Sequence, residues 1–192
     1  PEYDYCASSV DDDDPLPPFK VPRGHGGVAI MWKKSVSNLC TPQIDGSNRM
    51  NILSIGEHTI INTYMPCRGS KYTNQDFCEE VDNLHEILNK YKNTKIVLAG
   101  DMNVSEIQDD TRARYFKQLI SEHKVREAKK ISSPTFHNQN GKGTSKIDAI
   151  FLDEKWDISQ AVYEMDENVV NTSSHNALVL KINSNIAEVE NY

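Results

Sequence analysis

Apolar and polar positions follow two different periods along this chain, and the changes of period mark predicted strands and helices. Seven segments have the length and apolar character of strands: 26–32, 52–55, 59–64, 96–99, 146–152, 156–165 and 177–182. Gly56-Glu57-His58 lies between the second and third segments, which is typical of a short hairpin.

A helical period begins at Phe77. The residues of its apolar face alternate spacings of four and three positions: Phe77, Val81, Leu84, Leu88 and Tyr91. Either Thr73 or Asp76 could cap the start of this helix. His85 lies off the apolar face and is more typical of a surface histidine than of a ligand.

A second helix is predicted after Asp109 or Asp110, either of which could cap it. Phe116, Leu119, Ile120 and His123 lie on one face of this helix. The remaining segments read as irregular: 1–25 with its prolines and the acidic run at 11–14, and the polar loop 132–143.

Strands outnumber helices in this pattern, which predicts a mixed α/β (α+β) domain whose sheets are covered by a few helices. The 192 residues suit one domain, 1–192, with a frayed polar tail at 183–192. No internal repeat is present.

Composition and charge limit the kinds of function that this chain could have. The net charge of −7 argues against nucleic-acid binding by bulk electrostatics, although a local basic surface or a metal ion could still offset phosphate charge. No apolar run is long enough to cross a membrane, and the N-terminus does not resemble a signal peptide. The four cysteines lack C-x-x-C spacing, so we expect reduced thiols in an intracellular protein.

Gly100-Asp101-Met102-Asn103 follows the apolar run 96–99 directly. Glycine would let the backbone turn where the strand ends, and the turn would present a carboxylate beside an amide. Such a pair suits the orientation of a water molecule and the binding of phosphate. Gly-Asp is also a common turn dipeptide, so the motif alone leaves both interpretations open.

Three other short segments with polar side chains also stand at predicted strand ends: Tyr64-Met65-Pro66, Ser145-Lys146-Ile147-Asp148 and Ser173-Ser174-His175-Asn176. A phosphodiesterase needs a carboxylate to orient water, a donor to the phosphoryl oxygens, a carboxylate to fix that donor and metal ligands. The four segments stand at strand ends, where such a site could be assembled between two sheets.

With these motifs in order, the chain resembles the endonuclease/exonuclease/phosphatase superfamily, which has the deoxyribonuclease-I-like fold. It is most similar to the apurinic-type endonuclease domains of non-LTR retrotransposons and their domesticated relatives. The resemblance covers about residues 3–182 and rests on Arg23-Gly24-His25-Gly26-Gly27-Val28-Ala29-Ile30, Tyr64-Met65-Pro66, Gly100-Asp101-Met102-Asn103, Pro134-Thr135-Phe136 and Lys146-Ile147-Asp148. It implies a four-layer sandwich of two mixed β-sheets flanked by helices.

The resemblance also implies catalytic roles. Asp101 would orient or deprotonate the attacking water, and Asn103 would hold that water and contact phosphate. His175 would donate to a non-bridging oxygen, with Asp148 fixing its ring, and Tyr64 would hydrogen-bond the phosphate or leaving group.

Two further residues would contact substrate: Phe136, lining the pocket beside the scissile nucleotide, and Arg23. Simpler interpretations remain for several of these residues. Tyr64 could be a half-buried strand residue, Asp148 an ordinary polar strand end, and Phe136 part of the core.

The chain departs from the superfamily at the metal site. Ser174 stands where the family has an aspartate, and the family's first two strands, which carry a metal-binding glutamate, are missing before Pro1. Mg²⁺, or Mn²⁺ in its place, would therefore be weakly held, and no metal ligand is assigned. The missing strands would also leave an unpaired sheet edge.

We therefore expect a Mg²⁺-dependent phosphodiesterase domain of the retroelement endonuclease type that acts on DNA with little or no activity. We also expect a monomer that is intracellular, and nuclear if it acts on chromosomal DNA, without membrane association. The alternatives are a catalytically silent binding or scaffold domain, and a phosphatase acting on a small or lipid phosphate.

Overall fold

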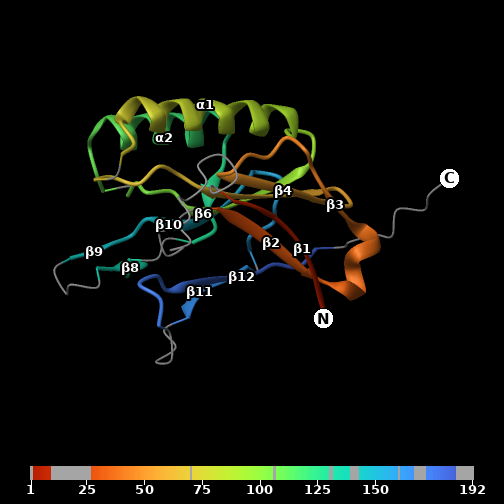
Figure 1. Ribbon diagram of the computed structural model, residues 1–192. Coiled ribbons are helices and arrows are strands. Elements are labelled where there is room, and N and C mark those ends of the chain that lie inside the picture. Colours follow the sequence, from red (N-terminus) through yellow and green to blue (C-terminus); the bar gives the residue numbers. More distant parts are fainter. Residues whose placement is uncertain are drawn as a thin grey trace, which may run out of the picture.

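The computed structural model describes residues 2–9, 27–69, 71–105, 107–129, 132–138, 143–159, 161–166 and 172–184. These residues form layers (Figure 1). Two α-helices cover one face of a six-stranded sheet, and two antiparallel strand pairs lie on the other side of that sheet.

The large sheet is mixed. Its strand order is β3 (Cys40–Pro42), β4 (Met50–Ile55), β5 (His58–Tyr64), β6 (Lys95–Asp101), β10 (Asp148–Leu152) and β7 (Arg126–Glu127). Neighbouring strands are antiparallel except for β5 and β6, which are parallel because a helix connects them. The predicted hairpin at Gly56 is confirmed, since β4 and β5 pair on either side of it.

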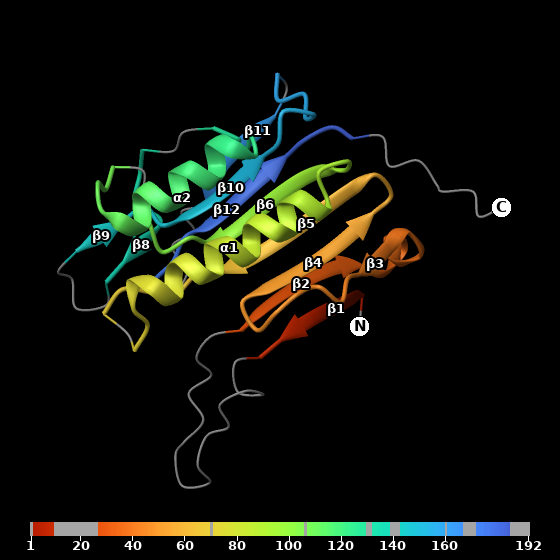
Figure 2. The same ribbon diagram turned by 90° about the horizontal axis from the view of Figure 1, so that it is seen from above.

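The connecting helix is α1 (Asn74–Lys90). Both proposed caps take part in a capping box: the Thr73 side chain accepts from the backbone of Asp76, whose carboxylate accepts from the Thr73 backbone. The helix buries Phe77, Val81, Leu84 and Leu88 of the predicted face against the sheet, together with Ile87, which was not predicted. Tyr91 is the C-cap and is half-buried. Helix α2 (Thr111–Glu122) lies beside α1, as Figure 2 shows, and Asp110 caps it.

The main core fills the space between these helices and the sheet, and Met50, Ile61 and Leu98 are among its fully buried members. A second cluster surrounds Trp156 on the other side of the sheet. The strand predicted at 156–165 is shorter in the structure, where β11 spans Val162–Asp166 and Trp156 lies before it. The Trp156 indole N–H donates to the Ile96 carbonyl, so the residue buries its ring without continuing a strand.

The prediction that 1–25 is irregular is wrong at residues 3–8. Strand β1 (Tyr3–Ser8) pairs with β2 (Val28–Lys33), and side chains along β1 alternate between exposed and half-buried. Asn51 of β4 fixes this hairpin to the large sheet, because its Nδ2 lies 2.8 Å from the Val28 carbonyl oxygen. The acidic run at 11–14 and Arg23 lie outside the described residues.

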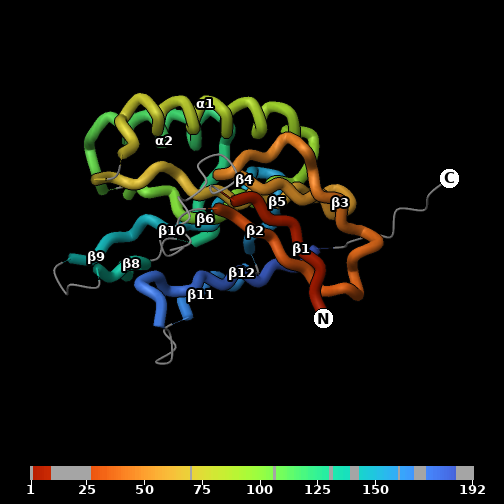
Figure 3. Tube along the Cα trace, viewed as in Figure 1, coloured from red at the N-terminus to blue at the C-terminus, as the bar shows by residue number. Residues whose placement is uncertain are grey.

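The loop predicted at 132–143 also contains structure. Strand β8 (Phe136–His137) pairs with β9 (Thr144–Ser145), so the polar segment forms a small hairpin. Strand β12 (Ala177–Lys181) pairs with β11, and a 3-10 helix, η2 (Lys34–Leu39), precedes β3. The Cα trace in Figure 3 places β1–β2 and β11–β12 on the same side of the large sheet.

The predicted α/β sandwich is therefore confirmed, and in the described ranges both α-helices lie on one face of the large sheet. None of the four cysteines, all within those ranges, forms a disulfide. Among the helices of the described residues, none is both long and apolar enough to span a membrane.

Candidate active site

Three of the expected catalytic residues occupy one row across the large sheet. Tyr64 at the end of β5 is in register with Asp101 at the end of β6, and Asp101 is in register with Asp148 at the start of β10. Side chains of directly paired residues stand on the same face of a sheet. Motifs that are far apart in the sequence thus meet at one end of three inner strands of the sheet.

This row requires a glycine at position 100, but for a reason other than the turn that the sequence predicts. The strand does not end at residue 99 but continues through Gly100 to Asp101. Gly100 has φ +135°, and a Cβ there would lie 1.9 Å from the Thr63 carbonyl oxygen. The glycine is needed for close approach of β5 rather than for a turn.

Asn103 holds the loop that follows β6. Its backbone has φ +49°, and its N–H donates to Oδ1 of Asp101 at 2.9 Å. Its side-chain Nδ2 donates to the Met65 carbonyl oxygen at 2.8 Å, directly beyond Tyr64. Asn103 therefore orients Asp101 and ties the ends of β5 and β6 together.

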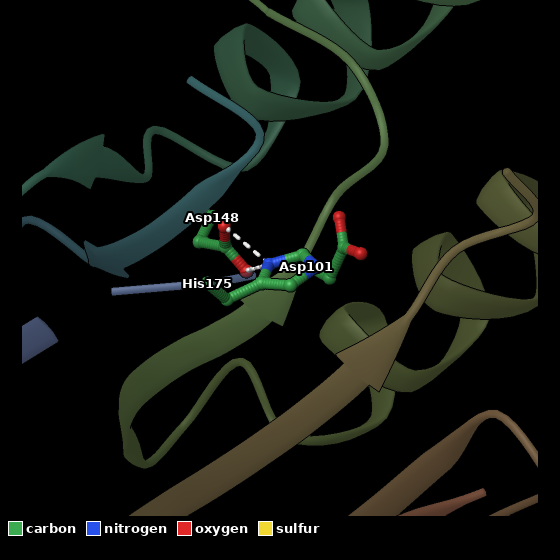
Figure 4. A group of neighbouring side chains, drawn as sticks. All are labelled: Asp101, Asp148 and His175. Carbon is green, nitrogen blue, oxygen red and sulfur yellow. Dashed lines mark hydrogen bonds and ion pairs between the residues drawn. The ribbon is translucent and has the colours of Figure 1, made fainter. Parts of the chain in front are cut away.

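His175 lies between the two aspartates (Figure 4). Its Nδ1 is 3.0 and 3.1 Å from the two carboxylate oxygens of Asp148. A β-bridge to Phe136 positions the residue, and the Phe136 and His175 rings lie 4.9 Å apart between centroids. The side chains of His175 and Asp148 are 35% and 16% exposed, so solvent can reach the ring.

Thr135 supports this arrangement, although its place in the sequence alone indicates no such role. The residue is fully buried, and its Oγ1 accepts from the backbone N–H groups of Ile147 and Asp148 at 3.1 and 3.0 Å. Its carbonyl oxygen accepts from Asn176 N–H. Thr135 thus links the segments that carry Asp148 and His175, and the only sequence signal was its place between Pro134 and Phe136.

The electrostatics of the row favour proton transfer near neutral pH. Burial raises the pKa of Asp101 to about 6, and the charge of Asp148 adds to this shift. The hydrogen bond to Asp148 raises the pKa of His175 and favours its imidazolium form. A carboxylate and an imidazolium can therefore be present side by side.

Tyr64 is held by Arg49, a second residue without an assigned role. The Arg49 guanidinium is buried, donates to the Tyr64 carbonyl oxygen at 3.0 Å and lies 5.4 Å from the Tyr64 ring centroid. It also stacks on Tyr72 at 4.4 Å. Burial raises the pKa of the Tyr64 phenol, which therefore stays protonated and can donate a hydrogen bond.

Asp101, Asp148 and His175 could hold a metal ion, since one ligand atom from each lies within 4.8 Å of the others. Carboxylate oxygens and imidazole nitrogens are common ligands of divalent metal ions. Both oxygens of Asp148 are engaged by His175, however, so a metal bound there would compete with that hydrogen bond. Of the two carboxylates, that of Asp101 could bind Mg²⁺ while the hydrogen bond between His175 and Asp148 stays intact.

The structure brings together six of the seven expected site residues, namely Tyr64, Asp101, Asn103, Phe136, Asp148 and His175. The seventh, Arg23, lies outside the described residues. Their catalytic roles remain predictions.

The sequence matches the family model described as endonuclease-reverse transcriptase over residues 58–179, well over half of the chain. This range includes Tyr64, Asp101, Asp148 and His175. No curated protein is similar enough to the chain to count as a match.

Solved structures share the fold at low sequence identity. The endonuclease domain of TRAS1, a telomere-specific non-LTR retrotransposon, superposes with a TM-score of 0.70 at 16% identity, covering 96% of this chain and 82% of its own. The 3′ phosphatase NExo from Neisseria, bound to a product DNA hairpin, gives 0.68 at 15%, with 95% and 80% covered. An AP endonuclease from Archaeoglobus fulgidus gives 0.66 at 19%, with 95% and 80% covered.

Proposed function

The chain belongs to the endonuclease-reverse transcriptase family, and from this premise we propose that it hydrolyses phosphodiester bonds in DNA at the Tyr64–Asp101–Asp148 row. Proteins that share its fold include an AP endonuclease and a phosphatase bound to a DNA hairpin, which supports DNA as the substrate. The net charge of −7 implies that DNA is held by local contacts at this edge rather than by the charge of the whole surface.

The Asp101 carboxylate is the proposed general base. A pKa of about 6 leaves it largely ionised at pH 7.5 and basic enough to accept a proton from water. The N–H of Asn103 fixes one of its oxygens, which leaves the carboxylate oriented before substrate binds. The water oxygen then forms a bond to phosphorus while its proton passes to Asp101.

The His175 imidazolium stabilises the negative charge that grows on the phosphoryl oxygens. Asp148 holds Nδ1, so Nε2–H is the donor directed away from Asp148 and toward substrate. The fixed ring requires no reorganisation during the reaction, which is the property of effective electrostatic catalysis.

Tyr64 completes the proposed reaction. Its phenol O–H donates a proton to the departing deoxyribose oxygen as the scissile phosphorus–oxygen bond breaks, and the phenolate then regains a proton from solvent. The products are a phosphate monoester and a hydroxyl group. A divalent ion held at Asp101 would add positive charge at the phosphate.

The observation that carries this proposal is the position of His175, which contacts Asp148 and has a ring nitrogen within 4.8 Å of an Asp101 carboxylate oxygen. A paired imidazole beside a carboxylate of raised pKa is unusual for a purely structural sheet edge and typical of catalytic sites.

Nicking of supercoiled plasmid DNA in Mg²⁺ or Mn²⁺ tests the proposal. We expect slow nicking by the unmodified chain and a loss of about 10²-fold or more in Asp101→Ala and in His175→Ala. Asp157→Ala changes an exposed residue outside the row and should nick at the unmodified rate.

Nicking that survives both Asp101→Ala and His175→Ala would refute the assigned roles. DNA binding without nicking, at any enzyme concentration and with either metal, would instead favour a silent binding domain. Release of phosphate from small or lipid phosphates without nicking would favour a phosphatase.

A further inference from the structure

Lys146 and Glu127 form a largely buried ion pair close to the proposed catalytic row. Nζ of Lys146 lies 2.6 Å from Oε2 of Glu127, and the two side chains are 20% and 3% exposed. Moving two charges out of water costs free energy that their attraction offsets only in part. Because apolar side chains of similar volume commonly stabilise a fold at least as well, stability alone does not explain this pair.

The ion pair connects the entry to β10 with the edge strand of the large sheet. Glu127 belongs to β7, the edge strand, and is in register with Phe151 of β10. In the described part of the chain, the backbone ladder between these strands covers Phe151 and Leu152 and does not extend to Asp148. The Lys146 side chain therefore supplies a link to β7 near the end of β10 at which Asp148 lies.

The segment that Lys146 holds is bonded to both proposed catalytic aspartates through the backbone. The Ile147 carbonyl oxygen accepts from the N–H of Met102 at 2.8 Å, and Met102 directly follows Asp101. Asp148 directly follows Ile147. A displacement of this segment would therefore change the positions of the Asp101 and Asp148 carboxylates together.

A cavity beside the segment gives it room to move. The cavity has a volume of about 30 Å³ and lies against α2, and its lining includes Lys146, Glu127, Asp148 and Met102. This volume is enough for about one water molecule, so side-chain packing against α2 is incomplete here. The ion pair thus holds the segment at a point where packing alone does not.

We propose that the Lys146–Glu127 pair is a clamp that positions the Asp101 and Asp148 carboxylates for the reaction, with Lys146 as the positioning residue. This inference rests on the proposed function, in which the two carboxylates act on one substrate. The clamp acts through the backbone of Ile147 and not on the substrate itself. A shift of about 1 Å in a catalytic group can lower a rate by about 10²-fold.

Replacement of the pair by apolar side chains separates positioning from stability. Because Lys146→Met/Glu127→Leu has no buried charge, we expect it to unfold at the same urea concentration as the unmodified chain or at a higher one. Its kcat for plasmid nicking should fall by about 10- to 100-fold, while KM changes by less than about twofold. The matched control, Lys124→Met/Glu154→Leu, removes an exposed ion pair of 3.1 Å and should leave kcat unchanged.

Amide hydrogen exchange measures the clamp without any need for nicking. The N–H groups of Met102 and Asp148 should exchange about tenfold faster in the apolar double variant, because the segment that they hold together moves more freely. The N–H of Leu84 in α1 should keep its exchange rate. If the double variant does not fold, Glu127→Gln, which has nearly the same shape, allows the same comparison with a smaller expected effect.

The outcomes separate the clamp from the proposed function. An unmodified chain that does not nick DNA would refute the function, and hydrogen exchange would still decide whether the clamp exists. Unchanged exchange at Met102 and Asp148, or an equal rise at Leu84, would overturn the clamp. Faster exchange with an unchanged kcat would overturn its role in positioning, and a loss of kcat that accompanies a lower urea midpoint would show a purely structural role.

Discussion

His175 and Asp148 form a two-oxygen contact, with Nδ1 of the histidine 3.0 and 3.1 Å from the carboxylate oxygens of an aspartate 27 residues earlier in the chain. One carboxylate thereby fixes the orientation of the ring and its charge. Because the Asp148 carboxylate contacts Nδ1, the opposite ring nitrogen, Nε2, is left to donate a hydrogen bond.

Replacement of Asp148 by Asn should separate these two effects. In Asp148→Asn the pKa of His175 should fall, because the amide carries no charge to stabilise the imidazolium. Nicking should fall by about 10²-fold. A proton NMR titration of His175 measures the first effect, with Asp157→Asn as the control, and an unchanged His175 pKa in Asp148→Asn would contradict the assignment.

Replacement of Asp101 by Asn should make the protein more stable while it removes activity. The pKa of Asp101 is raised from 3.8 to about 6 in the folded state. The folded state therefore binds this proton more tightly than the unfolded state, and the associated stability is present below pH 3.8 and is lost as the pH rises to 6. Above pH 6 the half-buried Asp101 carboxylate is ionised, which lowers the free energy of unfolding of the wild-type chain. Asparagine carries no charge, so the variant does not lose this stability.

We expect Asp101→Asn to raise the free energy of unfolding by about 1–3 kcal/mol at pH 7.5, and by much less at pH 4.5. Urea unfolding at both pH values measures the difference. A difference that is independent of pH would show that Asp101 is not the titrating group.

Replacement of Ser174 by Asp should increase metal-dependent activity. Ser174 stands where the superfamily resemblance places an aspartate, and its backbone carbonyl already accepts from His137 N–H, so the main chain is fixed in place. A second carboxylate beside His175 gives a divalent ion another charged oxygen. We expect Mg²⁺-dependent nicking to rise by about tenfold or more in Ser174→Asp and to stay constant in Ser174→Ala. Equal rates in the two variants would show that this position does not limit metal binding.

Gly100 and Gly143 offer a matched test of how the row is built. Both have φ near +135°, but a Cβ at Gly100 meets the Thr63 carbonyl at 1.9 Å, whereas one at Gly143 meets nothing within 4 Å. Gly143→Ala adds backbone strain alone and should cost about 1–2 kcal/mol, while Gly100→Ala should cost roughly 3–5 kcal/mol. Urea unfolding compares them, and equal losses would mean that the close approach of β5 is readily relieved.

Much of the fold followed from local pattern. The faces of α1 and α2, the hairpin at Gly56 and the caps at Thr73 and Asp110 depend on neighbouring residues, so the sequence displays them. Strand β1 was missed because its residues are polar or exposed, and pairing with β2 stabilises it rather than its own composition. The short β8–β9 hairpin was missed for the same reason.

The site was predictable as a set of residues, but the geometry was not. The motifs indicated Asp101, Asp148 and His175, yet nothing local shows that Tyr64, Asp101 and Asp148 share one row. Arg49 and Thr135 act through backbone groups of distant segments, so their roles become visible only in three dimensions.

The bridge between Phe136 and His175 has a consequence for synthesis. All strands of the large sheet precede His175 in the chain, so a nascent chain can close that sheet, with Asp101 and Asp148 already paired, before the histidine leaves the ribosome. Until then the two carboxylates stand together without the cation that balances them.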